Sequence, residues 1–112
     1  MPVTSRTTMD GPRRVTVSML QVLGILLSDP SRKDWFALDI CRATDLGSGT
    51  VVQVLFRIER WGWVESTWED MEDARDNGRP RRRFYRLTGT GAKSARKLIE
   101  SKFPRMLRWR PT

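Results

Sequence analysis

Histidine is absent from the chain, and cysteine occurs once, at Cys41. Without histidine the sequence can form neither a histidine-dependent catalytic triad nor a histidine metal site. A single thiol cannot form an intramolecular disulfide or a cysteine-rich zinc site. The carboxylates are scattered along polar segments, which gives them no fixed scaffold for acid-base catalysis. We therefore expect no metal, no cofactor and no enzymatic activity, and a reduced thiol in a cytoplasmic setting.

A long hydrophobic run is also missing. The most apolar stretch, VTVSMLQVLGILL, is about 13 residues long, which is too short to span a bilayer. Arg13 and Arg14 precede it in the order of a signal peptide, but SDPSRKDW follows without a small-residue cleavage site. We expect a buried first helix here and no membrane partner.

Positive charge is what the chain has in excess. Its 112 residues, enough for one domain, include 21 Lys and Arg against 13 Asp and Glu, a formal net charge of +8. Such an excess attracts phosphate at long range and favours an anionic partner. The sign alone does not distinguish DNA from RNA or lipid.

Apolar spacing and turn residues divide the chain into elements. Asp34 is the expected N-cap of the second helix and Ser48 that of the third. The polar interval from Glu69 to Pro80, acidic in its first part (69–77), is expected to be a mobile loop. The predicted elements are a flexible basic arm (1–14), helices at 16–28, 35–44 and 49–62, strands at 63–68 and 81–87, a helix at 88–103 and a basic tail (104–112).

This order of elements is typical of a winged helix-turn-helix: three helices, the last two joined by a short turn that contains Gly47, and then a two-stranded β wing. We expect an α+β fold that is mostly α, with the winged helix at 15–87 and a further helix at 88–103. An α-helix fits the major groove of B-DNA, so the third helix is the expected recognition helix.

Candidate DNA contacts lie on this helix and on the wing. If Val51, Leu55 and Ile58 face inward, polar side chains of the third helix face outward. Amide and guanidinium groups can bond base edges, and hydroxyls near a helix start can bond phosphates. The residues predicted to contact DNA are Ser48, Thr50, Gln53 and Arg57 on the helix and Arg79, Arg81, Arg82 and Arg83 on the wing.

Two simpler interpretations stay open. Gln53 and Arg57 would then be ordinary solvated helix positions. The wing arginines would form a solubilising strand neutralised by the acidic loop. Against a disordered basic tail, Phe84, Tyr85 and Leu87 are interspersed with the arginines, and we expect Tyr85 and Leu87 to enter the core.

Three blocks of this sequence resemble the PadR family of transcriptional regulators in its compact form: SGTV (48–51), IERWGWVES (58–66) and GRPRRRFYRLT (78–88). The resemblance runs from about Val17 to Ile99. It departs from the family where Tyr and Pro commonly follow SGTV, since this chain has Val52 and Gln53. The longer basic arm is also not a family feature.

The resemblance implies a homodimer that binds double-stranded DNA, usually as a repressor, at a roughly palindromic operator. It also implies a dimer formed by the first and last helices, which carry more apolar surface than one small core needs. Family members often answer to phenolic or drug-like ligands, so a small aromatic effector near Trp35, Trp63 or Trp109 is one interpretation; ordinary packing of these residues is the other. The expected interface residues are Leu20, Leu23, Leu27, Ala95, Leu98, Ile99 and Phe103.

Other classes remain as alternatives. A winged helix can be a protein-interaction module without specific DNA binding, and the acidic loop would then meet a basic partner. RNA binding would favour exposed stacking aromatics, whereas most aromatics here are expected in the core.

Overall fold

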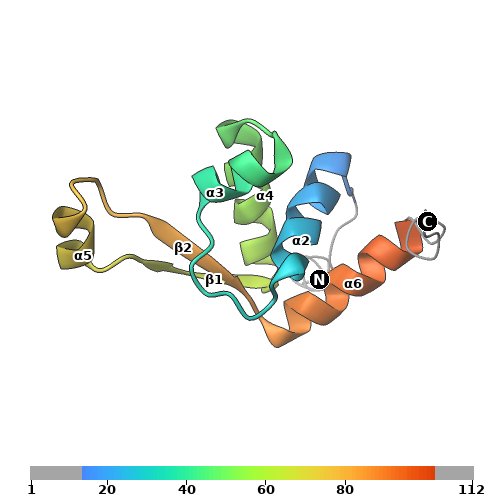
Figure 1. Ribbon diagram of the computed structural model, residues 1–112. Coiled ribbons are helices and arrows are strands. Elements are labelled where there is room, and N and C mark those ends of the chain that lie inside the picture. Colours follow the sequence, from blue (N-terminus) through green and yellow to red (C-terminus); the bar gives the residue numbers. More distant parts are fainter. Residues whose placement is uncertain (1–13, 103–112) are drawn as a thin grey trace, which may run out of the picture.

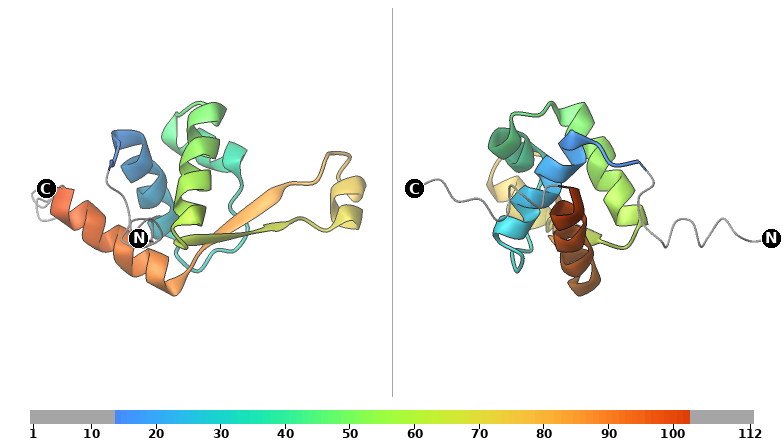
Figure 2. Two further views of the ribbon diagram at one scale, coloured as in Figure 1. Left: turned by 180° about the vertical axis from the view of Figure 1, so that it is seen from behind. Right: turned by 90° about the vertical axis from the view of Figure 1, so that its right-hand side faces the viewer.

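The computed structural model describes residues 14–102, which form five helices and a two-stranded hairpin (Figure 1). The elements are α2 (Val17–Ser28), α3 (Ala37–Thr44), α4 (Ser48–Arg60), β1 (Val64–Trp68), α5 (Met71–Asp76), β2 (Arg83–Leu87) and α6 (Gly89–Lys102). The hairpin projects from the helices with α5 at its end, and α6 runs along the other side of α2 (Figures 1 and 2). The mostly helical winged-helix architecture predicted from the sequence is confirmed.

The first helix, α2, is central to the core because it packs on α3, α4 and α6. Met19, Val22, Leu23 and Leu26 are fully buried, whereas Val17 is 67% exposed. The buried stripe of α2 thus begins at Met19. An apolar helix of this kind offers several possible buried faces, and its neighbours decide which one is used.

The second helix starts later than predicted. It begins at Ala37 after an extended Phe36 that provides no side-chain cap, so assigning the cap to Asp34 was wrong. The reason is tertiary: the backbone N–H of Tyr85 donates to the carbonyl of Trp35 at 2.7 Å, which pairs Trp35 with β2. Asp34 accepts a hydrogen bond from Arg32 instead.

The third helix also differs at its start. Gly47 is the N-cap and Ser48 the first helical residue, so the side chain of Ser48 does not cap the helix as predicted. The preceding turn reverses through Asp45, whose φ of 63° is left-handed.

Strands β1 and β2 pair antiparallel, with Val64 opposite Leu87 and Ser66 opposite Tyr85. Side chains that are opposite each other share a face of the sheet, so these residues lie on the face turned toward the helices. Tyr85 and Leu87 are each 9% exposed and belong to the core cluster. They anchor the wing as predicted.

The acidic segment is not the mobile loop that the sequence predicted, because α5 forms within it. Asp70 caps this helix by accepting hydrogen bonds from the backbone N–H groups of Glu72 and Asp73. Ala74 packs inward at 2% exposure, and Glu69 is also buried. A capped helix with a buried alanine and a buried carboxylate gives the wing a structured tip.

The start of α6 is fixed against the entrance to the hairpin. The hydroxyl of Thr88 donates to the carbonyl of Gly62 and accepts from the N–H of Gly91. From there α6 returns along α2. Most of the predicted arm (residues 1–13), Phe103 and the predicted tail (104–112) lie outside the described residues. Within residues 14–102, no helix has the length and apolar character needed to cross a membrane.

Candidate nucleic-acid interface

Helix α4 exposes three of its four predicted contact residues: Ser48, Thr50 and Gln53. Arg57 is half-buried, and its Nη2 donates to the carbonyl of Arg14 at 2.9 Å. The guanidinium of Arg57 also lies 5.4 Å from the ring centroid of Trp61. Arg57 is therefore held between Arg14, which precedes α2, and the end of α4.

Two apolar residues of α4 that the sequence analysis did not assign to this surface are exposed on it. Val52 is 50% and Phe56 58% exposed. The guanidinium of Arg60 lies 5.7 Å from the ring centroid of Phe56. The inward stripe of Val51, Leu55 and Ile58 contained the necessary signal, since helical spacing turns positions 52 and 56 away from it.

Arg79, predicted to contact DNA, forms an ion pair inside the wing. Its Nη2 lies 2.7 Å from Oε2 of Glu69, whose side chain is 6% exposed. A buried carboxylate requires a cation or several hydrogen-bond donors, and here Arg79 and the backbone N–H of Arg82 supply them. This pairing agrees with the simpler interpretation, in which the acidic segment neutralises part of the arginine run, and a DNA contact of Arg79 stays a prediction.

Three other predicted arginines lie beside aromatic rings, with Arg81 and Arg83 exposed and Arg82 half-buried. The guanidinium of Arg82 stacks 3.9 Å from the ring centroid of Phe36, and that of Arg83 lies 5.1 Å from Trp68. Arg81 lies 5.4 Å from Trp68 and donates from Nε to the backbone carbonyl of Glu69. Stacking on aromatic rings orders a guanidinium without neutralising it, which leaves its charge available to an anion.

The acidic partners of these arginines are few. Arg83 lies 3.8 Å from Glu59 of α4, a long ion pair, and Glu59 already accepts a 2.6 Å hydrogen bond from Ser66. Arg86, which was not predicted to contact DNA, is paired with Glu65 at 2.6 Å. Among the described residues, Arg81 and Arg82 form no ion pair with a carboxylate.

A cleft lies between the helices α3 and α4 and the wing. This helix–wing cleft has a volume of about 410 Å³ and contains no acidic side chain in its lining. Helix α3 begins in it without a side-chain cap, so N–H groups of its first turn are free to bond an anion. The lining residues are Phe36, Ala37, Leu38, Val52, Arg79, Pro80, Arg82, Arg83 and Tyr85.

Titratable groups contribute little chemistry to this surface. Burial raises the pKa of Tyr85 above its ordinary value, and Arg83 partly offsets that effect. The phenol is therefore neutral at physiological pH. Among residues 14–102, no three histidine, cysteine or carboxylate side chains are grouped so that they could hold a metal ion.

The tip of the wing has the opposite charge. Glu72, Asp73 and Asp76 are exposed on α5, beyond the arginines of the hairpin. These carboxylates would repel phosphate at short range. The wing is thus basic beside the helices and acidic at its end.

The predicted dimer residues separate into two groups. Leu23 and Ala95 have no exposed surface in a single chain, so the structure places them in the core rather than at an interface. Leu20, Leu27, Leu98 and Ile99 are half-buried and keep surface available.

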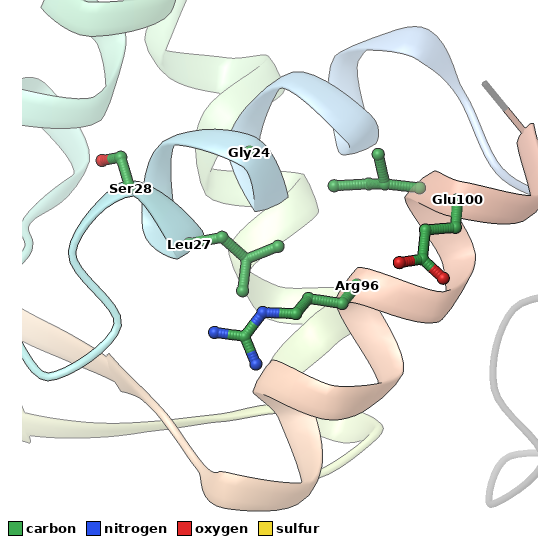
Figure 3. A pocket seen from close by; sticks show the side chains of 6 residues that line it. Gly24, Leu27, Ser28, Arg96 and Glu100 are labelled. Atoms are coloured by element: carbon green, nitrogen blue, oxygen red, sulfur yellow. The ribbon is translucent and has the colours of Figure 1, made fainter. Parts of the chain in front are cut away.

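The available surface of α2 and α6 includes a groove between the two helices, with a volume of about 390 Å³ (Figure 3). This α2–α6 groove is lined by Gly24, Leu27, Ser28, Arg96, Ile99 and Glu100. Trp35 and Trp63, proposed from the sequence as effector contacts, are each 6% exposed and belong to the core cluster. This agrees with ordinary packing. Trp109 lies outside the described residues.

Comparison with solved structures gives likenesses over most of the chain. The chain matches MepR of Staphylococcus aureus in a complex with DNA at a TM-score of 0.60 and 23% identity, over 94% of this chain and 74% of MepR. The fold is that of winged-helix transcription regulators. A second structure of MepR, a transcription regulator of the multidrug efflux pump MepA, gives a TM-score of 0.63 and 20% identity over 95% of this chain and 75% of MepR.

A third likeness, to a protein of Ralstonia eutropha, has a TM-score of 0.58 and 18% identity over 77% of this chain and 99% of that protein. No protein-family model matches the sequence, and no curated protein matches it. At these identities the likeness concerns the fold. What the protein binds has to be argued from its own residues.

Proposed function

We propose that the protein is a sequence-specific, DNA-binding transcription regulator that acts as a homodimer. The observation that carries the proposal is the helix–wing cleft, where Val52 of α4 and the wing residues Arg82 and Arg83 border one concave surface without a carboxylate. Phosphate fits the charges of this surface, and the exposed polar groups of α4 fit base edges. MepR, which has the same fold, forms a complex with DNA.

The finer assignment is a repressor of the PadR type that binds a roughly palindromic operator. It is supported by the three sequence blocks, which fall on the start of α4, the entrance to the hairpin and β2. The half-buried apolar residues of α2 and α6 support the homodimer, and a small aromatic effector would have the α2–α6 groove available. A dimer with two recognition helices reads two half-sites related by symmetry.

Selection of bound fragments from a random pool of DNA duplexes tests the proposal. We expect an enriched motif with two-fold symmetry, bound by two chains, as measured by sedimentation with labelled duplex. Recovery of fragments without a common motif would contradict sequence-specific binding. An asymmetric motif bound by one chain would contradict the homodimer alone.

One observation favours the alternative function, a protein-interaction module. The wing tip is acidic, and Met71 beside it is 58% exposed, which suits a basic protein partner better than DNA. Such a module would bind DNA of any sequence equally weakly at physiological salt. The duplex selection therefore distinguishes the two functions.

A further inference from the structure

The exposed side of α4 carries a row of residues without polar side chains, and these residues lie outside the hydrophobic core. Gly49, Val52 and Phe56 follow one another at spacings of three and four residues, which places them on one side of the helix. Val52 and Phe56 are half exposed or more. Exposed apolar side chains that lie next to one another are candidates for a contact with another molecule.

A second observation is that the space around Gly49 is open. Gly49 lies in the first turn of α4, and an added Cβ would meet no atom within 4 Å. The packing of this chain therefore does not explain the glycine. A missing side chain at the start of α4 would let the helix approach another molecule closely and bring Val52 against it.

The surroundings of this row indicate nucleic acid as that molecule. Val52 lines the helix–wing cleft with Arg82 and Arg83, whose charges suit a phosphate backbone, and Gln53 beside it can pair with adenine. In the major groove, the apolar group that an unmodified base pair presents is the 5-methyl group of thymine. A partner protein with an apolar anchor would fit Val52, but it would leave Arg82, which forms no ion pair with a carboxylate among the described residues, without an anion.

We propose that Val52, with Phe56 behind it, contacts the 5-methyl group of thymine in the bound DNA and so determines part of the sequence preference. This inference rests on the proposed function and deepens it. The contact distinguishes thymine from cytosine and from uracil. Because 5-methylcytosine carries its methyl group at the same position, the same contact would also make binding sensitive to cytosine methylation.

The test uses the full chain and the duplex recovered by selection. Each thymine of the motif is replaced in turn by uracil, which removes one methyl group and leaves the base-pairing groups unchanged. For the wild-type protein we expect a loss in affinity of about fourfold at a contacted position, the value for one buried methyl group. Replacements outside the motif should change nothing.

The matched variants are Val52→Ala and Val17→Ala, which both shorten an exposed valine. With Val52→Ala, the difference between thymine and uracil should disappear at one position of each half-site, while Val17→Ala should keep it. Both sites are exposed, so both variants should fold, and circular dichroism checks this. The uracil series on the wild-type protein requires no variant.

The outcomes separate this inference from the function on which it rests. A motif whose thymines can all be replaced by uracil within twofold in affinity would overturn the methyl contact and leave the regulator intact. A methyl dependence that survives in both Val52→Ala and Phe56→Ala would also overturn it, because other residues would then make the contact. If no motif is selected, both the function and the inference fail.

Discussion

Gly91 is the residue whose replacement the fold should tolerate least. A Cβ at this position would overlap the carbonyl oxygen of Trp63 and lie 2.6 Å from the carbonyl carbon of that residue. Neither partner can move easily, because that carbonyl also accepts the backbone N–H of Thr88. The close approach fixes where α6 leaves the hairpin.

Gly91→Ala should therefore lower the free energy of unfolding by about 1–3 kcal/mol, the usual cost of overpacking. Denaturant unfolding at one fixed protein concentration measures it. Gly89→Ala is the matched control, because a Cβ there meets no atom within 4 Å. Equal stability of the two variants would contradict the packing described for α6.

The raised pKa of Tyr85 leads to a prediction of how the free energy of unfolding depends on pH. Tyr85 is the only tyrosine of the chain, and burial raises its pKa above the ordinary value of about 10. The folded state thus keeps the phenol proton when the unfolded state begins to lose it. The contribution of Tyr85 to the free energy of unfolding is fully present below about pH 10 and is lost as pH rises through the pKa of Tyr85 in the folded state.

Absorbance of tyrosinate measures the pKa directly, since no second tyrosine contributes. We expect a midpoint above about 10 in the folded protein and near 10 in denaturant. Tyr85→Phe should flatten the decline in unfolding free energy above about pH 10. A folded midpoint at or below the denatured one would show that the side chain is not buried as described.

At the scale of elements, the spacing of apolar and polar residues correctly predicted the features that depend on neighbouring residues in the chain. The order of helices and strands, the anchors Tyr85 and Leu87, and the exposed Ser48, Thr50 and Gln53 all follow from spacing along the chain. Helix α5 was missed because it is only six residues long. Its cap, Asp70, followed by acidic residues in the first turn, is a signal that was present in the sequence.

Long-range pairing determined what local patterns could not predict. Trp35 is drawn out of the expected helix by Tyr85, which lies far along the chain. Arg79 and Arg82 belong to the same run of arginines, but the fold places the buried Glu69 beside Arg79 and Phe36 beside Arg82. Composition cannot make this distinction. The buried face of α2 is likewise selected by the elements that pack on it.

Two arginines of the wing differ in whether a carboxylate already neutralises them, and this difference should be measurable in DNA binding. Arg82→Ala should weaken binding to all DNA sequences alike and reduce the salt-dependence slope by about one for each lost phosphate contact. Arg86→Ala is the control on the same strand, since Arg86 is already paired with Glu65. Titrations of labelled duplex at several salt concentrations measure both. An unchanged slope for Arg82→Ala would remove the wing from the interface.

The acidic tip provides the complementary prediction. A carboxylate about 10 Å from a phosphate in water costs about 0.4 kcal/mol, or about twofold in affinity. Glu72→Gln with Asp76→Asn should therefore strengthen DNA binding about twofold or more at low salt, and the gain should vanish at high salt. Asp29→Asn, outside the wing, is the control. No gain at low salt would mean that α5 lies far from the DNA.

At the scale of the whole molecule, the surface that α2 and α6 leave available around their groove is the proposed site of dimerisation. Leu27 and Ile99 line the α2–α6 groove from opposite sides, and Leu20 and Leu98 lie nearby on the same two helices with surface to spare. If this surface joins two chains, a charge placed on it should separate them, because an unpaired charge is costly at an apolar contact. We expect Ile99→Glu to give a monomer in sedimentation equilibrium, whereas Val17→Glu, at an exposed site of α2, should not.

The consequence for DNA follows from geometry. Two recognition helices held by one dimer bind half-sites about one helical turn, 34–36 Å, apart. Inserting about half a turn of DNA between the half-sites rotates the second one away from its helix, so the wild-type protein should lose specific affinity for that duplex. Ile99→Glu should bind the original and the lengthened duplex equally, with the weak affinity of one half-site. If instead the wild-type protein is indifferent to the spacing, each chain reads DNA alone, and the apolar surface of α2 and α6 serves another partner.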